Sequence, residues 1–143
     1  MTDRMAWTFP AGRFVQEVTS VTLVNATTKT IDTTVPANKR WLLLSVKATN
    51  GDNVARVVGL YLFKEAAKTN LISVYDSASV NTAEHINFPN TIASRGVRSR
   101  AISPGEVLEA GNTISVIWTS GGASAGATDA DGLVICYLEI HVP

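Results

Sequence analysis

Hydrophobic residues recur with a period of two along several segments, and this pattern restricts the fold more than any other feature of the sequence. Segment 133–142, LVICYLEIHV, carries the longest clean apolar face: Val134, Cys136, Leu138, Ile140 and Val142. Glu139 and His141 fall on the opposite face, because successive side chains of a strand alternate in direction. Thr, Val and Ile are frequent, and these β-branched residues favour strands over helices. The pattern predicts an all-β protein.

Gly and Pro interrupt the apolar segments at short intervals, as is typical of a sandwich or barrel of short strands. The predicted strands cover residues 14–24, 27–35, 40–49, 54–63, 71–77, 96–102, 113–119 and 133–142. Strands that alternate with long helices, the mark of a parallel sheet, are not found. Residues 64–70 are the only cluster of good helix formers, and they allow a short helix or a loop.

These observations predict an antiparallel two-sheet β-sandwich, jelly-roll-like, with about eight strands. The length of 143 residues suits one domain. We expect residues 1–13 to form an N-terminal arm and residues 14–143 to form a single β-sandwich domain.

The strongest local signal is VPANKRWLLLSVKATN, at 35–50. By alternation, one face holds Leu42, Leu44, Val46 and Ala48, and the other holds Trp41 and Leu43. The second face is therefore apolar too, and it requires a second sheet layer, the arm or a neighbouring subunit to cover it. Asn50-Gly51 is a preferred dipeptide of tight hairpins, because both positions tolerate positive φ. Segment 54–63 is thus predicted to return beside 40–49.

The charge balance argues against several classes of protein. The chain has 12 basic and 12 acidic residues, whereas nucleic-acid-binding proteins usually have a basic excess. Charged residues make up 17% of the chain, below the roughly 25% typical of soluble domains, which leaves surface for partners. No segment approaches the ~20 apolar residues of a membrane span, and no signal peptide is visible. We expect no nucleic-acid or membrane partner, and synthesis in the cytosol.

Residues that could support catalysis or metal binding are few. His85, His141 and the single Cys136 do not supply the three or four ligands of a zinc site, and Cys136 is expected to be a small buried hydrophobe. The DADG segment at 129–132 lacks the third oxygen ligand and the distal Glu of a calcium loop. No GxSxG motif is present. The sequence predicts a non-enzymatic protein without catalytic residues, cofactor, metal or small-molecule substrate.

Several residues are candidates for contacts with partners or sister subunits. They are Trp7, Phe9, Trp41, Leu43, Arg95, Arg98 and Arg100. The two aromatic residues of the arm are costly to leave in water. The arginines form the only basic cluster, which suits an acidic partner surface or a solvated strand edge that discourages unwanted pairing.

Part of this sequence resembles a known group of proteins. The resemblance is carried by Val35, Pro36, Ala37, Lys39, Arg40, Trp41, Leu43, Leu44, Ser45 and Val46, by SPGEVLEAGN at 103–112, and by the terminal EIHV. This layout resembles β-sandwich structural proteins of tailed bacteriophages, most closely the small jelly-roll capsid decoration (cementing) proteins. The resemblance implies a virion structural protein on the capsid surface that binds the major capsid protein as a homotrimer and stabilises the head.

Two other functions stay open. The first is a receptor- or carbohydrate-binding β-sandwich module of a tail or head fibre, in which the small-residue loop at 120–131 contacts a glycan or receptor; long loops of this kind are often functional. The second is an enzyme subunit with a jelly-roll core, although the sequence lacks the cluster of His and acidic ligands that such enzymes use.

Overall fold

The computed structural model describes residues 12–23, 27–52, 54–80, 85–88, 106–119 and 128–143. Within these residues the chain forms nine strands and no helix. The strands are β1 (Gly12–Leu23), β2 (Lys29–Thr34), β3 (Lys39–Thr49), β4 (Arg56–Phe63), β5 (Leu71–Val80), β6 (His85–Phe88), β7 (Glu106–Leu108), β8 (Thr113–Trp118) and β9 (Thr128–His141).

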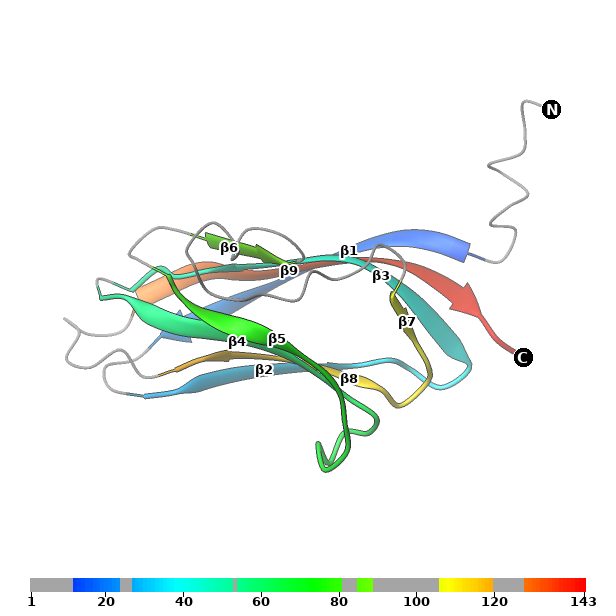
Figure 1. Cartoon of the computed structure of the whole chain (residues 1–143). Coiled ribbons are helices and arrows are strands. Elements are labelled where there is room, and N and C mark those ends of the chain that lie inside the picture. The colour runs from blue at the N-terminus through cyan, green and yellow to red at the C-terminus, as the bar shows by residue number, and fades with distance from the viewer. Residues whose placement is uncertain (1–11, 24–26, 53, 81–84, 89–105, 120–127) are drawn as a thin grey trace.

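The strands form two antiparallel sheets that lie one above the other (Figure 1). Sheet A has the order β1-β9-β3-β6, with the short β7 also paired to β3, and sheet B has the order β2-β8-β4-β5. From β1 to β4 the strands enter the two sheets in turn, β5 stays in sheet B beside β4, and β8 and β9 later enter the interior of sheet B and sheet A respectively. This arrangement is that of a jelly roll with one extra short strand. The predicted all-β, two-sheet fold class is therefore confirmed.

The core fills the space between the sheets and contains large apolar side chains from both. Sheet A contributes Trp41, Leu43, Val46, Ala48, Ile86, Leu108, Leu133, Ile135 and Tyr137, and sheet B contributes Val58, Leu60, Leu62, Ile114, Val116 and Trp118. All of these side chains are buried. The period-two pattern recognised in the sequence thus produces two inward faces that pack against each other.

The predicted hairpin between 40–49 and 54–63 is wrong. β3 pairs with β9, β6 and β7 in sheet A, whereas β4 pairs with β5 and β8 in sheet B. A two-residue type I′ turn needs positive φ at both central residues. Among the described residues positive φ occurs at Asn38, Lys68 and Gly111, and not at Asn50 or Gly51. The segment after β3 is therefore a corner through which the chain crosses from one sheet to the other.

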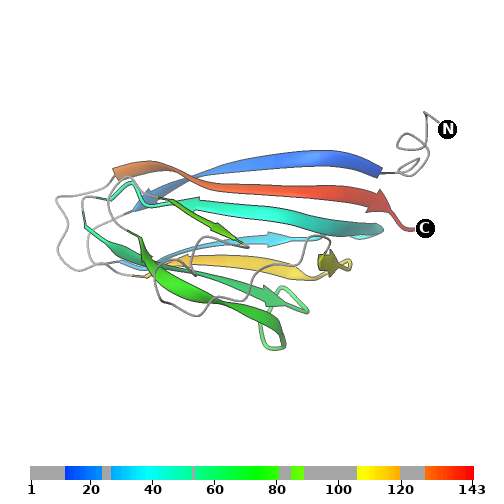
Figure 2. The ribbon, with the colours of Figure 1, turned by 45° about the horizontal axis from the view of Figure 1, so that its top comes forward.

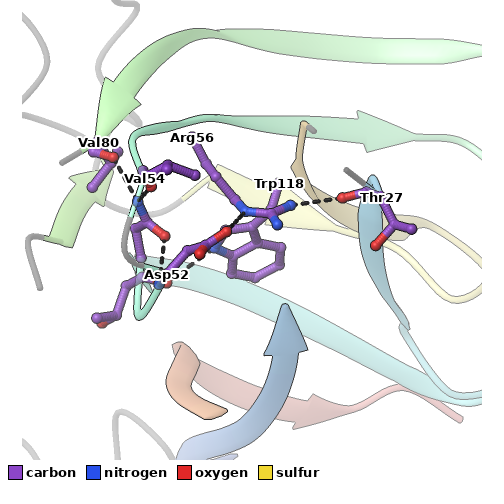
Figure 3. A network of polar contacts seen from close by, with 8 residues as sticks. Thr27, Asp52, Val54, Arg56, Val80 and Trp118 are labelled. Carbon is purple, nitrogen blue, oxygen red and sulfur yellow. Dashed lines mark hydrogen bonds and ion pairs between the residues drawn. The ribbon is translucent and has the colours of Figure 1, made fainter. Parts of the chain in front are cut away.

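Buried polar side chains hold this corner together (Figure 3). Asn50 donates from Nδ2 to the carbonyl oxygens of Val54 at 2.9 Å and Val80 at 2.7 Å. Its Oδ1 accepts a hydrogen bond from the backbone N–H of Asp52 at 3.0 Å. The Asp52 carboxylate then pairs with Arg56, with 2.6 Å between Nε and Oδ2 and both side chains fully buried. The same guanidinium reaches the carbonyl oxygen of Thr27 through Nη1, at 2.6 Å.

A register shift in β3 changes which side chains face the core. The pairing with β9 shifts between Leu43 and Ser45, so one residue is added to the strand and the alternation restarts. Before the shift, Trp41 and Leu43 point inward, and after it Val46 and Ala48 do so. Sheet B covers Trp41 and Leu43, which are 2% and 0% exposed. Their predicted role as partner contacts is therefore corrected: buried side chains offer no area to a partner.

Other predictions differ from the structure in detail. Residues 64–70 form bends and a turn, in which Lys64 donates its N–H to the Asn70 carbonyl at 2.8 Å. The short strands β6 and β7 were not predicted, because three or four residues are too few to show a period. β1 begins at Gly12, two residues before the predicted start at 14. The predicted strand at 96–102 lies outside the described residues.

The buried ion pair gives a test of the corner. Replacing Arg56 by Met leaves the Asp52 carboxylate buried without its cation, and losing one partner of a buried pair costs about 3–5 kcal/mol. We expect the free energy of unfolding, measured in urea, to fall by that amount. The matched control is Lys68→Met, which removes the exposed pair with Asp32 at 2.9 Å and is expected to cost less than about 1 kcal/mol. Equal effects of the two substitutions would contradict the role given to the corner.

Candidate functional site: the outer faces of the sandwich

The outer surface of sheet A is apolar over three adjacent strands. The apolar set of β9 identified in the sequence points to this side, while Leu133, Ile135 and Tyr137 point into the core. Across the sheet, Leu138 pairs with Phe14 of β1 on one side and with Leu42 of β3 on the other. We call this surface the sheet A face; it contains Phe14, Val18, Leu42, Leu44, Val107, Val134, Leu138 and Ile140. Strands β1, β9 and β3 lie side by side in Figure 2.

Several apolar side chains on this face are exposed to an unusual degree. Phe14 is 63% exposed and Val18 58% exposed, and Val107 of β7 is 49% exposed. A hollow of about 340 Å³ opens between Gly12, Phe14, Leu42, Leu44 and Leu138. Its lining is almost wholly apolar, so it offers a binding surface for an apolar group and no acid, base or nucleophile.

Sheet B carries a second apolar surface on its outer side, along β4 and β5. We call it the sheet B face; it contains Val57, Tyr61, Phe63, Leu71, Ile72 and Val74. Four of these side chains, Val57, Leu71, Ile72 and Val74, are between 38% and 47% exposed. Tyr61 and Phe63 stack with their ring centroids 6.4 Å apart. Contiguous apolar surface of this kind marks protein contact sites, and here it occurs on both outer sides of the sandwich.

A polar cluster occupies the rim between the two sheets, beside β1. The Glu139 carboxylate is 5% exposed and accepts hydrogen bonds from Trp41 Nε1 at 2.9 Å and Arg13 Nε at 3.0 Å. Lys39 Nζ lies 3.7 Å from the same carboxylate. The Trp41 ring stacks on Tyr137 with centroids 3.8 Å apart, and the Tyr137 hydroxyl donates to Glu17 Oε2 at 3.2 Å.

The charges of this rim cluster change the pKa values of two groups. Burial alone would raise the pKa of Glu139, but the hydrogen bonds from Trp41 and Arg13 and the nearby Arg13 and Lys39 charges lower it below its ordinary value. Burial, followed by the negative charge of Glu17, raises the pKa of Tyr137 to about 12. At neutral pH Glu139 is therefore an anion with all its cations in place, and Tyr137 is a neutral donor.

The rim cluster lines a shallow polar hollow of about 400 Å³, which also includes Val15, Gln16, Thr33, Thr34 and Pro36. Its one buried carboxylate, that of Glu139, already accepts hydrogen bonds from Trp41 and Arg13 and forms an ion pair with Lys39, which suits a structural clamp between β1, β3 and β9. Within the described residues no group of three or more His, Cys, Asp or Glu side chains could hold a metal ion. The described part of the chain also contains no helix with the length and hydropathy needed to cross a membrane.

The residues predicted as partner contacts fall into two groups. Trp41 and Leu43 belong to the core, as described above. Trp7, Phe9, Arg95, Arg98 and Arg100 lie outside the described residues, as does most of the loop at 120–131. Cys136, expected to be buried, is only partly buried on the sheet A face.

The sequence did not identify which apolar residues form the two outer faces. The signal was present for Leu138 and its neighbours in β9, whose apolar set is the longest in the chain. For β1 and β3, alternation identifies two faces but does not say which one a second sheet will cover.

No protein family model matches this chain, and no curated protein matches it. Among solved structures, a structure of the infectious bursal disease virus Gx strain aligns with 92% of this chain at 8% identity and a TM-score of 0.44. A structure of the VP2 subviral particle of the same virus aligns over the same share at 10% identity and a TM-score of 0.42. This chain spans about a third of those chains, 33% and 32% respectively. A likeness of this strength assigns no function.

The rim cluster gives a pH prediction. Glu139 has a lower pKa in the folded chain than the ~4.3 of an unfolded Glu, so its contribution to stability is complete above that value. The contribution is lost as the pH falls through the folded-state pKa, because the unfolded chain then binds more protons. We expect Glu139→Gln to be less stable than the wild type at pH 7 and to lose less stability on acidification. Urea unfolding between pH 3 and pH 7 measures both.

A second variant separates the hydrogen bond from the charge. Trp41→Phe keeps an aromatic ring against Tyr137 and removes the N–H donor to Glu139; the smaller ring also lowers stability at every pH, so the shape of the acid profile is the quantity compared. The pKa of Glu139 then rises toward its unfolded-state value, so the loss of stability on acidification begins at the same pH as in the wild type, is smaller in total, and is complete at a higher pH. An unchanged acid profile for both variants would sink this account.

Proposed function

We propose that this chain is a non-enzymatic virion structural protein: a capsid decoration protein that binds the head of a tailed bacteriophage as a homotrimer and stabilises it. The observation that carries the proposal is the apolar surface on both outer faces of the sandwich. The resemblance of segments 35–46 and 103–112 to phage decoration proteins supplies the specific role, the trimer and the major capsid protein as partner.

Two opposite apolar faces suit a protein that is covered on two sides. An isolated sandwich normally has polar residues outward and apolar residues inward along each strand, and here Phe14, Val18 and Val74 depart from that rule. In the proposed assembly, sister subunits cover part of one face and the capsid shell covers the other. Each contact can be weak, because attachment at many repeated sites multiplies the affinity.

The segments that carry the resemblance lie next to each other in the fold. Trp41 in β3 pairs with Leu108 in β7, and Val35 exchanges backbone hydrogen bonds with Gly111 and Asn112, both at 2.9 Å. Asn38 and Gly111, with φ of 61° and 88°, make the turns at this end of the sandwich. This proximity supports reading the two segments as one structural unit.

The first test is the state of the protein in solution and on capsids. We expect light scattering to give a mass three times the 15.2 kDa of the chain, and we expect the protein to co-sediment with expanded phage capsids at a fixed ratio of copies. Bound protein should raise the temperature at which the capsids break open. A monomer that does not bind capsids would falsify the proposal.

Charge substitutions on the two faces test which surfaces are covered. Val74→Glu on the sheet B face and Val18→Glu on the sheet A face each place a carboxylate in an apolar contact. We expect at least one of the two variants to lose affinity tenfold or more, either in capsid binding or in trimer formation. A tenfold loss corresponds to about 1.4 kcal/mol. Thr30→Glu adds the same charge to β2 of sheet B and should leave both unchanged. Wild-type assembly in both valine variants would show that neither face is used.

A further inference from the structure

Strand β1 is the longest edge strand of the two sheets. In the described part of the chain it pairs with β9 along one side, and no described strand pairs with its other side. The other edge strands are less suited to pairing with a second chain: β6 has four residues, β2 has six, and β5 has two register shifts against β4. Short strands and bulges keep sheet edges unpaired, as do proline and outward-pointing charges.

The regular part of β1 has neither proline nor an outward-pointing charge. Residues 12–19 keep one register with β9, and a register shift at residues 19–21 ends this stretch. Its outward side chains include Phe14, Gln16 and Val18. Phe14 and Val18 are more exposed than any other large apolar side chain in the described residues. Residues 12–19 therefore lack the features that protect an edge.

The charged side chains of β1 are self-complementary. Arg13 and Glu17 lie on either side of Val15, which packs against the core. Arg13 bonds to Glu139, yet its side chain is still 73% exposed. In an antiparallel pair with Val15 opposite Val15, Arg13 of each copy lies opposite Glu17 of the other. Opposite charges at directly opposed positions stabilise a strand pair.

The same register covers the exposed apolar side chains. Phe14 lies opposite Gln16 of the second copy and diagonal to the Phe14 of that copy, a spacing that aromatic rings can bridge. Val18 lies opposite Gly12 of the second copy, which has no side chain to crowd it. Both sides of β1 thus favour the same alignment.

We propose that β1 binds β1 of a second copy, edge to edge and antiparallel, about a two-fold axis at Val15. Sheet A then continues from one copy into the next, and the two sheet A faces form one apolar surface. The pair uses the strand edge, so both outer faces stay available for the trimer and capsid contacts. One strand pair buries a small area, as in weak contacts, so trimers prevail in dilute solution and join through β1 when concentrated. This inference goes beyond the proposed function, and its test needs no capsids.

A single cysteine at the axis tests the pair. In a Cys136→Ser background, Val15→Cys sets two thiols directly opposite each other, at a Cα separation of about 4.5–5.5 Å, which a disulfide can span. Glutathione disulfide oxidises the two thiols to one disulfide and is reduced to two molecules of glutathione. We expect concentrated protein to give a disulfide-linked pair of chains on a non-reducing denaturing gel.

The matched control is Val18→Cys in the same background. Position 18 is 58% exposed, so its thiol is accessible to the oxidant and to other chains. In the proposed pair, however, the two copies of residue 18 are offset by six residues, about 20 Å along the strands. We expect Val15→Cys to link at least tenfold faster than Val18→Cys. Equal rates, or faster linking at position 18, would overturn the proposal.

The effect of salt tests the register. Glu17→Lys added to Val15→Cys sets a second cation opposite Arg13 of the other copy and should slow linking at least threefold. In about 1 M salt, where the screening length is about 3 Å, Val15→Cys should link more slowly and the Glu17→Lys variant faster. Urea unfolding checks that both variants are folded. A salt effect of the same sign in both variants, or none in Val15→Cys, would overturn the alignment at Val15.

Discussion

The buried pair of Arg56 and Asp52 sets the point at which the chain leaves one sheet and enters the other. With the Asn50 side chain it satisfies the backbone carbonyl groups of Thr27, Val54 and Val80. Those groups belong to three separate crossings between the sheets, all at one end of the sandwich. Charges without access to water persist only when paired and hydrogen-bonded, so this corner favours one topology over the alternatives open to strands of the same hydrophobic pattern.

Sequence reasoning reached the fold class but not the pairing of the strands. Alternation in segments such as 113–119 and 133–142 is a local property, and it identified the long strands to within a few residues except at the start of β9. Asn50-Gly51 matched a hairpin signal, yet the side chains of Asn50, Asp52 and Arg56 bond to distant backbone groups that no local pattern reveals. The register shift after Leu43 was likewise invisible in the local pattern. Because of it, Trp41 and Leu43 point into the core beneath sheet B, whereas alternation alone had made them candidates for partner contacts.

The candidate site shows why a surface that works by contact is hard to predict. Catalytic and metal sites need rare residue types at fixed spacings, whereas an apolar face uses the residues that also build the core. The apolar set of β9 stood out in the sequence, but its outward direction emerged only once Leu133, Ile135 and Tyr137 were seen to fill the interior. The proposed decoration role therefore depends on a three-dimensional property, namely which of two apolar sides each strand turns outward.

The pairing of β1 with β9 also has a consequence for how the chain reaches its structure. Gly12 lies opposite Ile140 and Phe14 lies opposite Leu138, so sheet A joins residues from nearly opposite ends of this sequence. Contacts between residues so distant along the chain carry a large loop-closure entropy and are associated with slow folding, in milliseconds to seconds. Until β9 inserts between β1 and β3, their apolar outer residues and free edges are exposed together. The rate of that insertion then determines how long the chain is open to aggregation.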